Sequence, residues 1–242
     1  MVLTESGLHV LRYAEEIFSL GQDLVASVEA NIVDRPLRLT VGVADVLPKR
    51  VAHALILPAF HLPKKIRIVC REDSPERLLA ELAVQEVDVV LSGAPVPPSV
   101  SVRAQSHLLG KTGVCLMASP RIAPSLRAGF PESMTGAPLL VPTERAAVRR
   151  ELDRWFDEHN VHAMVVGEFD DFALMGVFAQ AGDGAFPVPE VIADEAALEF
   201  GVERVATLDG LTGNFYAICL ERNIEREAVS AILSGAAFQP SP

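Results

Sequence analysis

The sequence has few cysteines and no close pair of them, which excludes a fold held together by disulfide bonds. Its 242 residues include three cysteines, Cys70, Cys115 and Cys219. An odd number of well-separated thiols suits a reducing compartment, so we expect a cytoplasmic protein. Each cysteine lies among Val, Ile and Leu, which favours buried, unreactive thiols. Cys115 and Cys219 could still approach each other on neighbouring strands, which leaves a redox-sensing pair as an alternative.

Basic residues are also scarce, and this limits what the chain can bind. Lys and Arg number 21 against 32 Asp and Glu, which gives a net charge of -11. Such a balance argues against contact between these residues and a DNA backbone or an anionic membrane surface, since both need a basic face. No apolar run reaches the roughly 18 residues of a membrane span. No secretion signal opens the sequence. We therefore expect no membrane partner.

Signatures of catalysis and metal binding are missing as well. The sequence contains no Gly-x-Ser-x-Gly elbow, no Walker motif and no dinucleotide-binding loop. His159 and His162 follow two acidic residues, but without a cysteine or a zincin pattern they indicate the surface end of a helix. Asp170 and Asp171 are adjacent at a helix start and point different ways, which does not suit shared acid/base chemistry. We expect no catalytic residue.

Hydrophobic residues are plentiful, at 50% of the sequence, and they follow a regular pattern along the chain. Short runs of Val, Ile and Leu alternate with longer amphipathic segments, which predicts strands and helices in turn. Strands are expected at 37–43, 65–70, 87–91, 114–118, 139–141, 164–166, 205–208 and 214–220, with a strand-and-turn segment at 182–189. Helices are expected at 48–60, from a cap at Ser74, at 144–158 after a cap at Thr143, from Asp170 or Asp171 to 180, and at 225–233.

The order of these elements predicts the fold class. Repeats of strand, helix and strand give a parallel sheet with covering helices. Two such halves in succession match an α/β fold of two Rossmann-like lobes in a periplasmic-binding-protein-like arrangement, in which the chain crosses between lobes twice. We therefore expect residues 34–113 and 217–242 to form lobe I and residues 114–216 to form lobe II. The crossings are expected near 114–119 and 211–216.

A long helix is expected over residues 3–30, ahead of the two lobes. Small and apolar residues recur there at spacings of three and four: Leu11, Ala14, Phe18, Gly21, Val25 and Val28. A second stripe, at intervals of seven, consists of Val10, Ile17 and Leu24. This repeat is typical of a helix that pairs with another helix, so we assign residues 1–33 to a dimerising linker. The alternative is an amphipathic helix that lies on its own domain.

Three stretches carry a resemblance to the LysR-type transcriptional regulators. Residues 3–7, Leu-Thr-Glu-Ser-Gly, followed by the long helix, are similar to the end of the family's winged helix-turn-helix and its linker helix. Residues 182–187 resemble the family's Gly-x-Gly-x-x-x-Pro stretch with the proline displaced by one position. Residues 55–60 resemble the end of the family's first regulatory helix. The resemblance covers nearly the whole chain and implies an effector-binding regulatory domain without catalysis.

The DNA-binding domain of this family would precede the Leu-Thr-Glu stretch and is absent from these residues. The resemblance therefore implies that this chain senses an effector and forms a homodimer or tetramer. Contact with DNA would belong to a winged helix-turn-helix outside the 242 residues, which agrees with their acidic balance.

Four loops are expected to face a cleft between the lobes, since ligands of open parallel sheets bind beyond the carboxyl ends of the strands. They supply the candidate ligand-binding residues Ala44, Asp45, Val46, Ser92, Gly93, Ala94, Thr143, Glu144, Phe169, Asp170 and Asp171. The resemblance implies that hydroxyls and backbone amides at helix N-termini hold a carboxylate there, which suits the partial positive charge of such a terminus. The acidic loop residues either satisfy the helix dipoles internally or line a cation site.

Residues 13–18 and 168–171 resemble a subgroup of the family that regulates sodium/proton antiporter genes. That resemblance implies a sodium ion as the effector. The acidic loops are compatible with sodium, because a hard cation prefers oxygen ligands, although no EF-hand spacing is present. A small organic effector remains open, and we expect no other cofactor.

Two other classes of protein share the same two-lobed scaffold. An enzyme would need a nucleophile or a pair of acid/base residues, and the helical repeat over residues 10–28 also disfavours it. A solute-binding protein would need an export signal, which the first residues lack. The regulatory domain is therefore the leading prediction.

Overall fold

The computed structural model describes residues 36–98, 100, 104–224 and 226–235, together with nine isolated positions between 4 and 25. The predicted helix over 3–30 falls mostly outside the described residues, so it stays a prediction. Three described positions, Val10, Ile17 and Leu24, belong to the predicted stripe, and each is helical and exposed.

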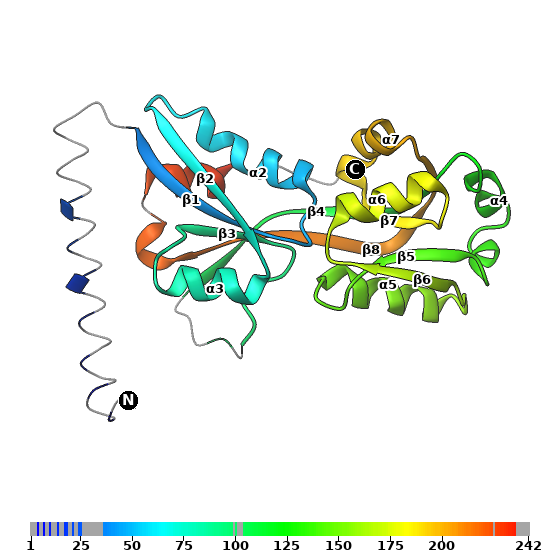
Figure 1. The fold of residues 1–242 in the computed structure, drawn as a ribbon, viewed down its shortest axis with the longest axis horizontal. Coiled ribbons are helices and arrows are strands. Elements are labelled where there is room, and N and C mark those ends of the chain that lie inside the picture. The colour runs from blue at the N-terminus through cyan, green and yellow to red at the C-terminus, as the bar shows by residue number, and fades with distance from the viewer. Residues whose placement is uncertain are drawn as a thin grey trace.

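Lobe I is a parallel sheet covered on both faces by helices (Figure 1). It consists of β1 (Leu37–Ala44), α2 (Lys49–Phe60), β2 (Ile66–Asp73), α3 (Pro75–Ala83), β3 (Val89–Ser92) and α8 (Glu227–Ser234). Strand β1 lies between β2 and β3 and is parallel to both. Its alternate residues Leu39 and Val41 pack with the buried faces of α2 and α8, whereas Leu78 and Leu82 of α3 belong to a separate cluster.

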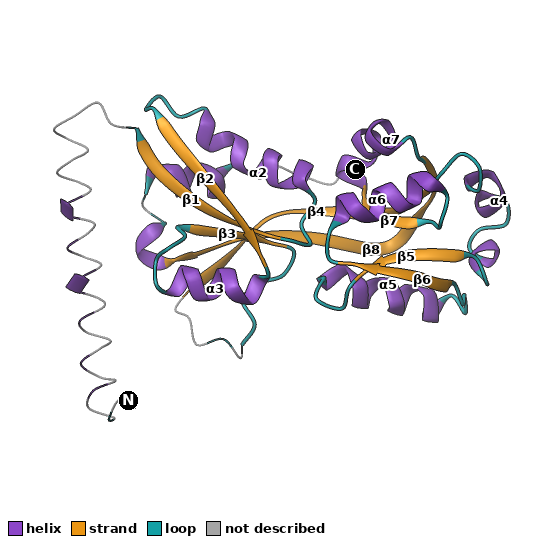
Figure 2. Cartoon of the chain, in the orientation of Figure 1, coloured by secondary structure: helices purple, strands orange, loops and turns teal. Residues whose placement is uncertain are grey.

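Lobe II is built around a smaller parallel sheet of two strands (Figure 2). It consists of α4 (Ala123–Arg127), β5 (Pro138–Pro142), α5 (Ala147–Glu158), β6 (Met164–Phe169), α6 (Phe172–Ala181), β7 (Phe186–Pro189) and α7 (Ala193–Phe200), with 3-10 turns at Glu132–Met134 and Glu190–Ile192. Leu152 and Phe156 of α5 pack with β5 in one cluster, while Met175 of α6 packs with Leu140 in another. The two helices therefore cover opposite faces.

Two long antiparallel strands, β4 (Ala104–Ala118) and β8 (Glu203–Leu220), run through both lobes and join them (Figure 1). In lobe I, β8 pairs with β3, and in lobe II, β4 pairs with β7. The joined sheet therefore has the order β2-β1-β3-β8-β4-β7. Between the lobes, residues 110–113 of β4 pair with residues 212–215 of β8, and register shifts flank this crossing ribbon on both sides.

The predicted α/β architecture of two lobes is confirmed. The predicted bounds of the two longest strands, β4 and β8, were wrong. The expected strands at 205–208 and 214–220 belong to one strand, β8, and the expected strand at 114–118 is the end of β4. The glycine-containing stretch 209–213 has the composition of a loop, yet it lies within β8, where Thr212 and Gly213 pair with β4 and the register shifts before them. The helix α7 was not expected. None of the helices in the described ranges is long and apolar enough to cross a membrane.

Cys115 and Cys219 are buried, as predicted, but Cys70 is exposed on the edge strand β2. Burial raises the pKa of both Cys115 and Cys219 to about 11. Cys219 lies opposite Gln105 of β4, whereas Cys115 is ten residues further along that strand. At about 3.3 Å per residue they are roughly 30 Å apart, and a disulfide needs Cα atoms within about 7 Å. The alternative of a redox pair is therefore wrong.

We expect Cys70 alone to react with a thiol reagent in the folded protein, because the thiolate is the reactive form and the other two thiols are buried. Titration with a disulfide reagent near neutral pH should label one thiol per chain, and all three after denaturation. Cys70→Ser should abolish the reaction of the folded protein. Rapid labelling of Cys115 or Cys219 in that variant would contradict the assignment.

Candidate functional site

A cavity of about 560 Å³ opens between the two lobes. It lies beyond the carboxyl ends of β1 and β3 in lobe I and of β5 and β6 in lobe II, where α/β sheets place their ligands. Residues 212–216 of β8 also line it, so the crossing ribbon forms part of the wall. Its volume is in the range of small-molecule sites.

Five of the eleven candidate residues line this cavity. They are Val46, Gly93, Ala94, Phe169 and Asp170. The backbone turn after β3 that exposes Gly93 and Ala94 is fixed by Ser92, whose buried hydroxyl accepts a 3.1 Å hydrogen bond from the Ala94 amide. These residues come from three of the four predicted loops, and no bound ligand tests the choice of residues, which stays a prediction.

The other candidates lie beside the cavity or away from it. Ala44 is fully buried in β1. Asp171 is the N-cap of α6, and its carboxylate accepts a 2.6 Å hydrogen bond from the Leu174 amide. Glu144 is exposed and does not line the cavity. The prediction that Thr143 caps α5 is wrong, because that helix begins later, after Ala146. The Thr143 hydroxyl instead donates to Asp170.

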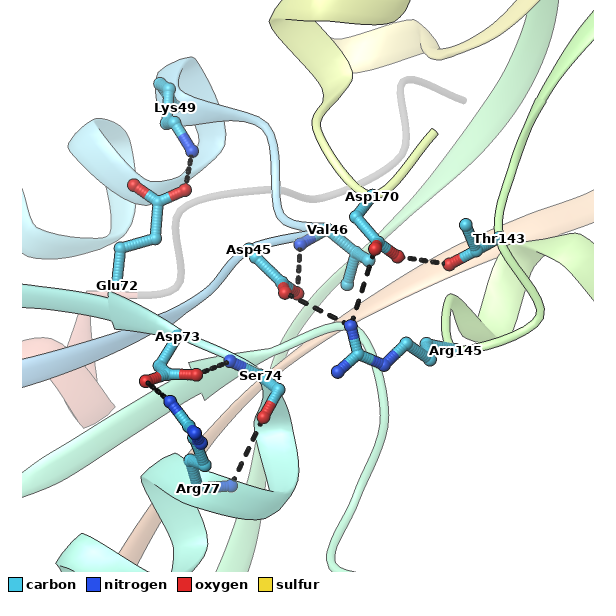
Figure 3. Close-up of polar contacts among 10 residues, drawn as sticks. All are labelled: Asp45, Val46, Lys49, Glu72, Asp73, Ser74, Arg77, Thr143, Arg145 and Asp170. Atoms are coloured by element: carbon cyan, nitrogen blue, oxygen red, sulfur yellow. Dashed lines mark hydrogen bonds and ion pairs between the residues drawn. The ribbon is translucent and has the colours of Figure 1, made fainter. Parts of the chain in front are cut away.

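An arginine that we did not select from the sequence joins the acidic loops. Arg145 Nη1 lies 3.7 Å from a carboxylate oxygen of Asp45 in lobe I and 3.5 Å from one of Asp170 in lobe II (Figure 3). On the same side, Lys49 of α2 contacts Glu72 and lies 3.5 Å from Asp171. Three of the four predicted carboxylates, Asp45, Asp170 and Asp171, therefore lie near a cation of the chain, although Asp45 and Asp170 share one.

The surroundings of Asp45 disfavour its ionised form. Partial burial raises the pKa of its carboxyl, and this outweighs the opposing effects of the Val46 amide and the Arg145 guanidinium. Asp170 and Glu72 add to the rise by repulsion. Within the described part of the chain, no group of three or more His, Cys, Asp and Glu side chains is placed to hold a metal ion.

The rest of the cavity wall combines aromatic surface with charged residues of α5, among which Glu151 pairs with Arg154. Phe169, Phe172 and Phe215 provide aromatic surface. The first turn of α5 also lines the cavity, and its N-cap, Ala146, offers no side-chain acceptor to the free amides. Arg150, one turn on, lines the cavity too, and among the described residues we find no hydrogen bond or ion pair from its guanidinium. Arg150 is therefore a cation in the cavity wall without a described partner.

We expect Asp45→Asn to raise the melting temperature near pH 7. The pKa of Asp45 is higher in the folded protein than its ordinary value of 3.8. Ionisation of this carboxyl therefore lowers the free energy of unfolding as the pH rises from 3.8 through the raised pKa. Asparagine keeps the acceptor for the Val46 amide, which lies 2.8 Å from Asp45 Oδ1. Thermal unfolding between pH 4 and pH 7 should show a gain that shrinks toward low pH. Asp45→Ala, which loses the acceptor, is the control, and a lower melting temperature for Asp45→Asn would contradict the expectation.

A two-lobed α/β domain with a ligand-sized cavity at its facing strand ends is an effector-binding domain in architecture. The family model of the LysR substrate binding domain matches residues 36–234. The chain therefore belongs to the LysR family, and the resemblance drawn from its sequence is confirmed.

Among characterised relatives, the chain is similar to the transcriptional activator protein NhaR of Escherichia coli (strain K12). The two are 29% identical over 245 residues, which cover 98% of this chain and 79% of the relative. NhaR of Shigella flexneri matches with the same identity and coverage. The family match and this similarity indicate a transcriptional regulator.

Solved structures show the same fold at low sequence identity. The apo-form regulatory domain of HypT from Salmonella typhimurium superposes with a TM-score of 0.64 at 12% identity, over 85% of this chain and 98% of that chain. HinK, a LysR family transcriptional regulator from Pseudomonas aeruginosa, superposes with a TM-score of 0.63 at 12% identity, over 98% of this chain and 82% of that chain.

Proposed function

We propose that this chain is the effector-sensing and oligomerisation part of a cytoplasmic, NhaR-like transcriptional activator. Contact with DNA would be made by a winged helix-turn-helix outside these residues. The observation that carries the proposal is the cavity of about 560 Å³ at the facing strand ends of a LysR-type fold. Nothing in the described part of the cavity combines a nucleophile with a general base, so a binding role suits it better than catalysis.

Two effectors are compatible with the cavity. A sodium ion would need oxygen ligands, and the carboxylates that line the cavity are Asp170 and Glu151, but Asp170 already faces Arg145 and Glu151 faces Arg154. A small organic anion suits the wall better, because the aromatic surface would hold its apolar part and Arg150 would face its charge. We therefore propose a small organic anion as the effector, with sodium as the second candidate.

Titration calorimetry and thermal shift assays distinguish these effectors. Sodium and potassium chloride at equal ionic strength should give identical curves if sodium is not the effector. A panel of small aromatic and aliphatic carboxylates should include ligands that stabilise the protein. Arg150→Gln should lower the affinity for such a ligand by about tenfold, since a hydrogen bond to a charged group contributes about 1.5–3 kcal/mol.

Arg222→Gln is the matched control, because this arginine is exposed and lies outside the cavity. A sodium-specific shift would support the sodium effector instead. If no carboxylate binds, or if Arg150→Gln and Arg222→Gln bind it equally well, the proposed anion site is wrong.

We also propose that lobe II contributes a surface to the homo-oligomer. Helix α6 contains no charged residue, and it is apolar all round although only part of it is buried. Together with the edge strand β6 it exposes a group of large apolar side chains: Met164, Val165, Val166, Leu174, Val177 and Phe178. A helix that is hydrophobic on every side is normally covered, so a second copy of the chain is the proposed cover.

Val177→Glu should therefore lower the molar mass of the protein in solution, because a carboxylate in an apolar interface stays unpaired. The side chain is 52% exposed in the single chain, so folding should be unaffected. Light scattering coupled to gel filtration measures the mass, and circular dichroism checks the fold. Leu198→Glu on α7, at a side chain 87% exposed and outside this surface, should leave the mass unchanged. Equal masses for all three proteins would rule out this interface.

A further inference from the structure

Ion pairs between the two lobes gather at the first turn of α2. Lys49 Nζ lies 3.5 Å from a carboxylate oxygen of Asp171, the N-cap of α6. The next residue, Arg50, places its Nε 3.5 Å from a carboxylate oxygen of Glu199 in α7. Both partners belong to lobe II, so this single helical turn is tied to two different helices across the cleft.

A third pair lies just ahead of the helix, where Asp45 faces Arg145 at 3.7 Å (Figure 3). Val46 and Pro48, between Asp45 and Lys49 in the chain, line the interlobe cavity. The lobe I members of the three pairs are therefore close in sequence to cavity-lining residues, and parting of the lobes would break all three pairs.

The charges of three of these residues have the wrong sign for their own helices. The N-terminus of a helix carries a partial positive charge, yet α2 begins with Lys49 and Arg50, and its N-cap, Pro48, provides no side-chain acceptor. Glu199 lies in the last turn of α7, where the partial charge is negative. Contact between Arg50 and Glu199 offsets both unfavourable placements at once. When the lobes part, Arg50 and Glu199 lose this contact and keep only the unfavourable interaction with their own helix ends. The contact therefore favours closure of the lobes.

The crossing ribbon allows such a parting. Its residues include Gly110, Gly113 and Gly213, and the register shifts on either side interrupt the regular ladder. Only two strands pair in this segment, and a two-stranded ribbon twists more freely than a wider sheet.

We propose that these three ion pairs form an electrostatic latch that holds lobe I against lobe II and is released by rising ionic strength, whatever the cation. The side chains of Lys49, Arg50, Glu199 and Asp171 are each between 41% and 60% exposed, so the pairs are open to screening by salt. The screening length falls from about 10 Å at 0.1 M salt to about 3 Å at 1 M. This regulation goes beyond the proposed function, because it acts on the chain without any effector.

The interlobe distance tests the latch directly. Spin labels at Ala80→Cys in α3 and Glu158→Cys in α5, both exposed positions, report the distance in the full chain with Cys70→Ser as background. The distance should lengthen between about 0.05 M and 1 M salt, and sodium, potassium and choline chloride should give the same curve. A constant distance, or a change specific to one cation, would overturn the proposal.

A charge-swap cycle at Arg50 and Glu199 provides the matched control, since the structure gives neither side chain another ion pair among the described residues. Arg50→Glu and Glu199→Arg should each lengthen the distance at low salt. The double variant should restore the short distance and its salt dependence. Equal distances in all four proteins, or effects of the single changes that simply add in the double variant, would contradict the latch. Because no effector is present, the outcome is independent of whether the proposed anion binds.

Discussion

The pairing of β4 with β8 is the constraint on which the rest of the structure depends. These two strands contribute one end to each lobe, where β8 pairs with β3 of lobe I and β4 pairs with β7 of lobe II. The ladder of hydrogen bonds along the ribbon fixes how far apart the lobes lie. It also places the carboxyl ends of β1 and β3 opposite those of β5 and β6, which creates the cavity. The ribbon resists stretching but permits bending where its glycines lie.

The energies of closure and of effector binding are of similar size, which is what a sensor requires. Exposed ion pairs contribute about 0–1 kcal/mol each, so three of them hold the lobes together by a few kcal/mol at most. A ligand that binds with millimolar affinity supplies about 4 kcal/mol. Moving a two-state equilibrium from 1:99 to 99:1 takes about 5.5 kcal/mol of differential binding. One weak effector per chain would therefore shift the population in part, and coupling between copies would make the response steeper.

Local sequence signals predicted the elements that depend on local rules. The apolar alternation of β1 and the Ser74-Pro75 start of α3 are local signals, and the structure has both elements near the expected bounds. The crossing ribbon was missed because Gly110, Gly113 and Gly213 indicate loops, and only pairing across the lobes makes them extended. The same distinction holds at the site. Val46, Gly93 and Asp170 could be found because they follow strands, whereas Arg150 and the first turn of α5 line the cavity only because the lobes face each other.

The acidic composition of the chain does not decide the sign of its binding site. A net charge of -11 is spread over the whole surface, and at physiological salt charges more than about 8–10 Å away are largely screened. What a ligand meets is the local set of groups. In the cleft, Arg145 is shared by Asp45 and Asp170, Lys49 lies near Asp171, and Arg154 pairs with Glu151. That leaves Arg150 and the free amides of α5 as the uncompensated groups that we describe in the cavity wall. An acidic protein can therefore present an unpartnered cation in its cleft, while Asp45 and Asp171 of the acidic loops take part in ion pairs between the lobes.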